Sequence, residues 1–332
     1  MRLKKEIRIL VCLVIILLFV ILGVFLVTDF FQKEEDAPKE LTEEEKLVQQ
    51  GIKLVSSESF GEDVHSLLDK GYTVDEINHI YENMSDSNII HILGSEYVDL
   101  SDFYSIHNFD FKKLERYIAY SKIENLDMKD IVTRVDLNLD EPFYQTVVTV
   151  DNPDDITVLV NKSHALPASY SPTDLVSIPS FSNLKLRKVA VDDFEKLLAN
   201  AKLDNVYLVP YSTYRDYEYQ DGLYQKYLKT DTQANVDTYS ARPGHSEHQT
   251  GLAIDIRSSS HWYTLTDADY EWMKKNCYKY GFIIRYPKDN STITGYKEEP
   301  WHLRYIGIEH ATKVTELGIT YDEYYDLYFK EY

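Results

Sequence analysis

The sequence predicts an α+β domain preceded by a small all-helical module and an N-terminal transmembrane helix. In the second half of the chain, strand-like and helix-like patterns are mixed without the regular β-α-β alternation of a doubly wound sheet. Between residues 41 and 135 the apolar residues have helical spacing, and residues 9–27 form one apolar run. These three observations set the expected order of the parts.

Residues 9–27 have the length and the flanking charges of a single transmembrane helix. An apolar run of 19 residues crosses a hydrocarbon core of about 30 Å. Basic residues precede the run and acidic residues follow it, so the N-terminus is expected in the cytoplasm and the body of the chain outside. These charges are Arg2, Lys4, Lys5 and Arg8, then Asp29, Glu34, Glu35 and Asp36. No small-x-small cleavage site follows, so we expect residues 1–30 to be a permanent, single-pass anchor in the cell membrane.

Residues 31–45 are predicted to be an acidic linker, and residues 46–145 a small helical module. Pro38 and the acidic side chains of the linker favour an extended chain. In the module, Thr73-Val74-Asp75-Glu76 has the spacing of a capping box at a helix start. Helices are expected, as loosely repeated helix-turn units, at residues 41–51, 60–70, 73–84, 112–120 and 128–135. Both a spacer role and a binding role are open for this module.

The predicted α+β domain occupies residues 146–332. The pattern becomes strand-like at residues 146–150, which places the domain boundary there. Further strands are expected at residues 156–160, 206–209, 252–256, 282–286 and 301–306. Helices are expected at residues 189–202, 217–228, 267–280, 309–317 and 321–328. A hairpin-like loop of residues 288–297 joins the last two strands.

The composition argues against some classes of function. The chain carries 55 Asp and Glu against 35 Lys and Arg, whereas nucleic-acid binding needs a basic face, so no nucleic-acid partner is expected. The two cysteines, Cys12 and Cys277, lie in the apolar N-terminus and in a helical pattern, and they provide no disulfide framework. We expect Cys277 to be an inert buried thiol.

Two short stretches of the second half contain the groups that a catalytic zinc site needs. His248 and His302 offer imidazoles, Asp255 offers a ligating carboxylate, and Glu299 offers a second carboxylate for proton transfer. Asp255 lies in an apolar run typical of a buried strand, where an unpaired carboxylate is costly, so it should bind a cation or a hydrogen-bond donor. A simple hydrogen-bonded pair is the common alternative for one His and one Asp. The complete ordered pattern favours the metal.

The pattern Ser-x-His-x-x-Gly-x-Ala-x-Asp, followed by Glu-x-x-His, resembles the zinc D-alanyl-D-alanine carboxypeptidases of the VanY type and the related zinc L,D-carboxypeptidases. It occurs here at residues 246–255 and 299–302 without a substitution. Tyr214-Arg215-Asp216-Tyr217 is similar to a third segment of that family, with Asp216 where serine is usual. The resemblance extends from about residue 158 to the C-terminus. It implies an antiparallel sheet with flanking helices and zinc in a groove.

The resemblance also implies a role for each residue of the two main motifs. His248, Asp255 and His302 are expected to bind Zn²⁺ and to leave one position open for water. Glu299 is expected to be the catalytic general base, which takes a proton from that water and later delivers it to the leaving amine.

Three further residues are expected to bind the substrate. The resemblance implies that Arg215, Gln220 and Ser246 hold its terminal carboxylate or polarise the scissile carbonyl, which gives Arg215 a catalytic role as well. The residue types suit these tasks, because a planar guanidinium pairs with a carboxylate through two donors. A cation near the carbonyl oxygen also stabilises the charge that develops in the transition state.

The sequence therefore predicts a membrane-anchored, extracytoplasmic zinc carboxypeptidase that removes terminal D-alanine from peptidoglycan stem peptides. The first alternative is an L,D-carboxypeptidase acting on tetrapeptide stems, because these motifs do not separate the two specificities. The others are a non-catalytic cell-wall binding module and an endopeptidase. The intact Glu299 argues against the binding module, and Arg215 favours an enzyme that acts at a chain end. The expected partners are the stem peptide and the membrane.

Overall fold

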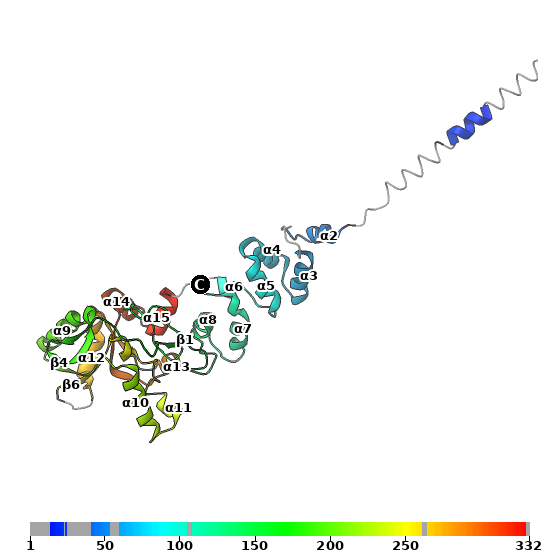
Figure 1. Cartoon of the computed structure of the whole chain (residues 1–332). Helices are drawn as coiled ribbons and strands as arrows, with labels where there is room; N and C mark the ends of the chain where they lie inside the picture. Colours follow the sequence, from blue (N-terminus) through cyan, green and yellow to red (C-terminus); the bar gives the residue numbers. More distant parts are fainter. Residues whose placement is uncertain are drawn as a thin grey trace, which may run out of the picture. The chain divides into compact units, whose positions relative to one another are not determined.

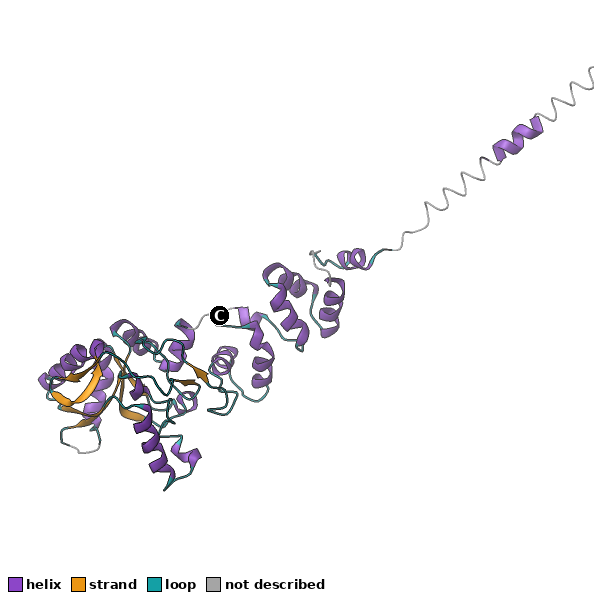
Figure 2. Cartoon of the chain, in the orientation of Figure 1, coloured by secondary structure: helices purple, strands orange, loops and turns teal. Residues whose placement is uncertain are grey.

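The computed structural model describes residues 14–22, 24, 41–53, 60–104, 106, 108–260 and 264–329 (Figure 1). The chain forms two compact units, Met1–Tyr97 and Val98–Tyr332. The first unit is helical in its described part. The described part of the second combines helices with sheets, the largest of which has four antiparallel strands (Figure 2). The structure thus has the predicted α+β class with a helical region before it.

The predicted transmembrane helix, residues 9–27, lies largely outside the described residues, which include 14–22 and 24 of it as helix. Across the described ranges, no helix is both long enough and apolar enough to cross a membrane. Residues 31–40 of the predicted linker and Cys12 also lie outside these ranges. The membrane anchor therefore stays a prediction.

The first unit shows why its sequence has helical spacing. Its helices are α2 (Glu43–Gln49), α3 (Phe60–Lys70), α4 (Val74–Asn83) and α5 (Asp86–Gly94). Thr73 begins α4 with the predicted capping box: its hydroxyl accepts from the Glu76 N–H, and the Glu76 carboxylate accepts from the Thr73 N–H. One face of each helix is buried, through Leu47, Val64, Leu67, Ile77, Ile80, Ile89 and Ile92.

The second unit begins with helices that belong to the same compact body as the sheet. They are α6 (Ser101–Tyr104), α7 (Leu114–Ser121) and α8 (Met128–Asp136), with a 3-10 turn η1 (Phe111–Lys113) before α7. Asn108 links this segment to the C-terminal helix α15 (Tyr321–Tyr328), because its Nδ2 donates to Asp326 (2.7 Å) and to Asp136 (3.2 Å). The compact units divide after Tyr97. The boundary that the sequence places near residue 146 stays a prediction.

The four-stranded sheet has the strand order β5-β6-β8-β7 and carries the candidate site. Its strands are β5 (Leu208–Ser212), β6 (Ala253–Ser258), β7 (Phe282–Tyr286) and β8 (Glu299–Tyr305). Asp255 lies directly opposite His302 in the antiparallel register. Because side chains alternate along a strand, Ile254, Ile256 and Leu303 pack into the core while Asp255 and His302 face the other side.

Helices cover the core face of this sheet. From α9 (Lys188–Leu203) come Phe194 and Leu197, and from α12 (Asp267–Asn276) comes Met273. Cys277, in the 3-10 turn η3 (Cys277–Tyr280), is buried in the same cluster, as predicted. The remaining elements are β1 (Val148–Thr149), β2 (His164–Ala165), β3 (Leu175–Ile178), β4 (Phe181–Arg187), α10 (Tyr217–Leu228), α11 (Gln233–Val236), α13 (Ser291–Thr294) and α14 (Ile308–Leu317).

The prediction of a strand at residues 156–160 is wrong. This largely buried segment is irregular, and its carbonyls accept hydrogen bonds from the side chains of Arg304 and Tyr321 and not from a neighbouring strand. The guanidinium of Arg304 donates to the carbonyls of Ile156 (3.0 Å) and Val158 (2.7 Å). The predicted loop of residues 288–297 is largely confirmed and contains the one-turn helix α13.

Candidate metal centre and active site

The site begins where a 3-10 turn, η2 (Glu247–Thr250), leads into β6. The turn carries His248 and ends at Gly251, whose φ of 68° lies in the left-handed region. A Cβ at Gly251 would lie 2.8 Å from the Leu175 side chain and 3.0 Å from that of Arg187. The positive φ and the close packing both require glycine here. The turn therefore places His248 beside Asp255 of β6.

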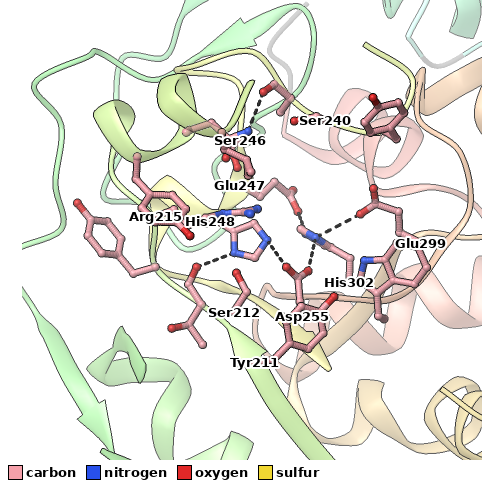
Figure 3. A pocket seen from close by; sticks show the side chains of 18 of the residues that line it. Tyr211, Ser212, Arg215, Ser240, Ser246, Glu247, His248, Asp255, Glu299 and His302 are labelled. Carbon is pink, nitrogen blue, oxygen red and sulfur yellow. Dashed lines mark hydrogen bonds and ion pairs between the residues drawn. The ribbon is translucent and has the colours of Figure 1, made fainter. Parts of the chain in front are cut away.

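His248, Asp255 and His302 each offer one ligand atom, and these atoms all lie within 4.8 Å of one another (Figure 3). The Asp255 carboxylate lies between the imidazoles, with Oδ2 3.2 Å from His248 Nε2 and Oδ1 3.2 Å from His302 Nδ1. His248 Nε2 and Asp255 Oδ1 are buried and make no hydrogen bond to any described residue. Two nitrogens and one oxygen form the donor set of a catalytic zinc with an open fourth position. The residues therefore fit a metal ion.

The other nitrogen of each imidazole already has a partner, which determines the tautomer. His248 Nδ1–H donates to the Thr213 carbonyl (2.6 Å), and His302 Nε2–H donates to Glu247 Oε2 (3.1 Å). The second nitrogens, His248 Nε2 and His302 Nδ1, consequently face Asp255, and each carries a lone pair when its ring is neutral. The two histidines are thus arranged as ligands through opposite ring nitrogens.

Burial and neighbouring charges shift the pKa values of the site. Burial lowers the pKa of His248 to about 4, which keeps this imidazole neutral, as a ligand must be. Burial would lower the pKa of His302, but Asp255 and Glu247 outweigh burial and raise this pKa to about 9, so a bound metal would take the place of a proton there. Burial raises the pKa of Glu299 to about 7; its Oε2 lies 3.7 Å from His302 Nδ1 (Figure 3).

Glu247 is a buried site residue that was not predicted from the sequence. Its Oε1 accepts from Arg285 Nε (2.7 Å) and from Arg304 Nη1 (2.9 Å). Burial would raise the pKa of Glu247, but the two guanidinium groups outweigh burial and hold the pKa below its ordinary value. Both arginines come from the apolar strands β7 and β8, where a buried cation needs a carboxylate. An arginine within each of these two apolar strands is the sequence feature that indicates a buried carboxylate nearby.

All seven residues predicted for the site line one cavity of about 790 Å³, namely His248, Asp255, His302, Glu299, Arg215, Gln220 and Ser246. Arg215 Nε and Gln220 Oε1 are buried and make no hydrogen bond to any described residue, whereas Gln220 Nε2 donates to the Ala241 carbonyl (2.8 Å). Asp216 caps α10 by accepting from the Tyr219 N–H (2.8 Å). The Asp216 carboxylate, present where serine was expected, therefore stabilises the start of α10.

Comparisons with known proteins agree with this geometry. The VanY family model, described as D-alanyl-D-alanine carboxypeptidase, matches residues 183–308. YodJ of Bacillus subtilis strain 168, a protein named as a carboxypeptidase, is 36% identical over 228 residues, which cover 65% of this chain and 83% of YodJ. A D-alanyl-D-alanine carboxypeptidase of Enterococcus faecalis is 36% identical over 177 residues, 50% of this chain and 64% of the relative.

Among solved structures, the LdcB LD-carboxypeptidase is similar at a TM-score of 0.50 with 38% identity. The match covers 54% of this chain and 90% of LdcB. The family match at residues 183–308 contains the four-stranded sheet and the residues that line the cavity. LdcB is named as an LD-carboxypeptidase, whereas the family model is described as D-alanyl-D-alanine carboxypeptidase.

Proposed function

Because the chain belongs to the VanY family of D-alanyl-D-alanine carboxypeptidases, we propose that it removes the terminal D-alanine from peptidoglycan stem peptides by metal-assisted hydrolysis. One observation carries the proposal: the three converging ligands, a buried glutamate and an arginine line the same cavity. The cavity is the size of a small-ligand site, which typically has a volume of roughly 300–1,000 Å³.

His248, Asp255 and His302 would hold a Zn²⁺ ion. When bound, the ion supplies an activated water and polarises the scissile carbonyl. Glu299 lies at the start of β8, beside His302, and burial raises its pKa toward neutrality. A carboxylate with such a pKa can take a proton from the attacking water and return it to the leaving amine at neutral pH.

The terminal carboxylate of the substrate would bind to Arg215 and Ser246. Arg215 has a buried Nε that makes no hydrogen bond to any described residue, and a guanidinium can donate two parallel bonds to a carboxylate. Gln220 has an accepting atom to offer, because its Nε2 already donates to the Ala241 carbonyl and its Oε1 lacks a partner among the described residues. An acceptor suits a substrate N–H better than a carboxylate, so Gln220 would orient the last peptide unit.

The experiment is digestion of matched stem peptides by the zinc-loaded protein, followed by mass spectrometry. One peptide ends in D-Ala-D-Ala and the other in L-Lys-D-Ala. We expect loss of one alanine from the D-Ala-D-Ala peptide. The Glu299→Gln variant, which keeps the metal ligands, should bind zinc but release alanine at a rate lower by at least about 100-fold. No release from either peptide by the zinc-loaded wild type would contradict the proposal.

L,D-carboxypeptidase activity is the second candidate. The observation that favours it is the 38% identity to LdcB, over 90% of that chain, at a TM-score of 0.50. Release of alanine from the L-Lys-D-Ala peptide alone would select this function over the first.

We also propose that the enzyme is a single-pass membrane protein whose catalytic part lies outside the cytoplasm. The support is the apolar run of residues 9–27, with basic residues before it and acidic residues after it. This location would place the cavity on the side of the membrane where peptidoglycan is found.

A further inference from the structure

The Glu247 carboxylate lies behind His302, and its two oxygens have different partners. Oε1 accepts from Arg285 Nε and Arg304 Nη1, at 2.7 and 2.9 Å. Oε2 accepts from His302 Nε2–H at 3.1 Å (Figure 3). The Glu247 side chain has no exposed surface. Two fixed donors on one oxygen thus aim the other oxygen at the imidazole.

The two arginines are themselves held in place, so the carboxylate has little freedom to turn. Arg285 Nη1 donates to Asp322 Oδ2 (2.6 Å) and Nη2 to Asp322 Oδ1 (3.2 Å). Arg304 Nη2 donates to the carbonyls of Ile156 and Val158. Every contact around Oε1 is therefore made by a side chain that has a second anchor elsewhere in the fold.

We propose that Glu247 is a positioning residue for the metal centre. By accepting the Nε2–H of His302, it directs Nδ1 toward Asp255 and the metal, and in the neutral, metal-binding form of the ring it keeps the lone pair on Nδ1. A carboxylate in this place also makes the imidazole a more basic ligand than the Thr213 carbonyl makes His248. The proposal rests on the metal site of the proposed function, and its test measures metal binding without substrate.

An isosteric change separates this role from simple charge balance in the core. In Glu247→Gln, the amide oxygen is best used on Arg285 and Arg304, which can only donate. The amide NH₂ then faces His302 Nε2 and favours a lone pair there, with the proton on Nδ1. That tautomer blocks the ligand atom. Asp322→Asn is the matched control, because it also removes one buried carboxylate from Arg285 but leaves the Glu247–His302 hydrogen bond in place.

The experiment compares full-length wild type, Glu247→Gln and Asp322→Asn. Zinc affinity is measured by competition with a chromogenic chelator, folding by circular dichroism, and the protonated nitrogen of His302 by ¹⁵N NMR. We expect Glu247→Gln to fold and to lose about 10- to 100-fold in zinc affinity, the range typical of partners of ligating histidines. Its metal-free form should show His302 protonated on Nδ1 but not on Nε2, whereas the metal-free wild type should keep the proton on Nε2. Asp322→Asn should lower the unfolding midpoint but keep zinc affinity near that of wild type.

Two results would overturn the proposal. One is wild-type zinc affinity in folded Glu247→Gln, and the other is an equal loss of affinity in both variants, which would mean that the buried charges act only on stability. If Glu247→Gln does not fold, Glu247→Asp decides with the same readouts. Its carboxylate, one methylene shorter, can keep the charge beside the arginines but not the reach to His302, so its zinc affinity should fall, and wild-type affinity would overturn the proposal. Zinc binding without alanine release by wild type would contradict the proposed reaction but not this role of Glu247.

Discussion

His248 and His302 approach the same carboxylate with different ring nitrogens, and the reason lies in the residue behind each ring. A backbone carbonyl occupies His248 Nδ1, and a buried glutamate occupies His302 Nε2. Each ring is thus left with one nitrogen for a metal, on the side of Asp255. The hydrogen bonds behind the two rings therefore orient both imidazoles without a bound metal.

The proposed carboxylate clamp gives a prediction for single residues. Arg215→Met should lower kcat/KM about 10- to 100-fold on a stem peptide with a free terminal carboxylate, because a hydrogen bond to a charged group contributes about 1.5–3 kcal/mol. On the same peptide with an amidated terminus, the loss should be much smaller. Lys297→Met is the control, since Lys297 is another cation of the cavity wall. Equal losses on both peptides would contradict a clamp at Arg215.

The segment of residues 237–246, between α11 and η2, forms a wall of the cavity. Asp237, its first residue, connects it to neighbouring elements. The Asp237 carboxylate accepts from Arg242 (2.8 Å) and from the Tyr224 hydroxyl (2.7 Å), and its carbonyl accepts from Lys162 Nζ (2.7 Å). Lys162 also donates to the Gly295 carbonyl (2.6 Å). These bonds join α10, the wall and the loop before β8.

Asp237 gives this wall a defined dependence on pH. Burial would raise its pKa, but Arg242 and Tyr224 outweigh burial, and the pKa is lowered from its ordinary value of 3.8. The folded state therefore binds this proton less readily than the unfolded state, and the contribution to stability is present above pH 3.8 and lost as the pH falls below it. Asp237→Asn should lower the free energy of unfolding by about 1–3 kcal/mol at pH 7.

Urea unfolding of the metal-free proteins, followed by circular dichroism, tests this prediction. The difference between wild type and Asp237→Asn should narrow over the pH range below 3.8, because the wild-type carboxylate becomes protonated there and asparagine does not titrate. A difference that stays constant over this range would show that the charge of Asp237 contributes nothing.

The elements that carry the ligands could be predicted because their signals are local. Asp255 lies within an apolar strand pattern, and Gly251 marks the turn before it. Glu247 could not be placed, because its partners come from β7 and β8 and meet only when the sheet forms. A long-range contact also explains the wrong strand at residues 156–160. The carbonyls of Ile156 and Val158 accept from Arg304, and no local pattern encodes that contact.

At the scale of the whole molecule, we propose that the N-terminal run lies in the membrane and the rest of the chain in water. The apolar run near the N-terminus would lie in lipid, and the acidic remainder, which gives the chain a net charge of −20, would lie in water. The enzyme would then act on substrate close to the membrane surface.

This arrangement predicts where the protein is found in cells. The full chain should sediment with membranes and should be digested by protease added outside cells from which the wall has been removed. A chain without residues 1–30 should stay soluble and keep its activity on the stem peptide. Recovery of the full chain in the soluble fraction would contradict the anchor.

The hydrogen bond between Asn108 and Asp326 bears on how the protein is best shortened for crystallisation. Asp326 lies one helical turn after Asp322, the residue that holds Arg285 behind the metal centre. A fragment that starts at residue 146 lacks Asn108, and so loses its hydrogen bond to α15, and it also lacks α7 and α8. A fragment that starts before Val98 keeps Asn108, α7 and α8, and we expect it to be the more stable and more soluble of the two.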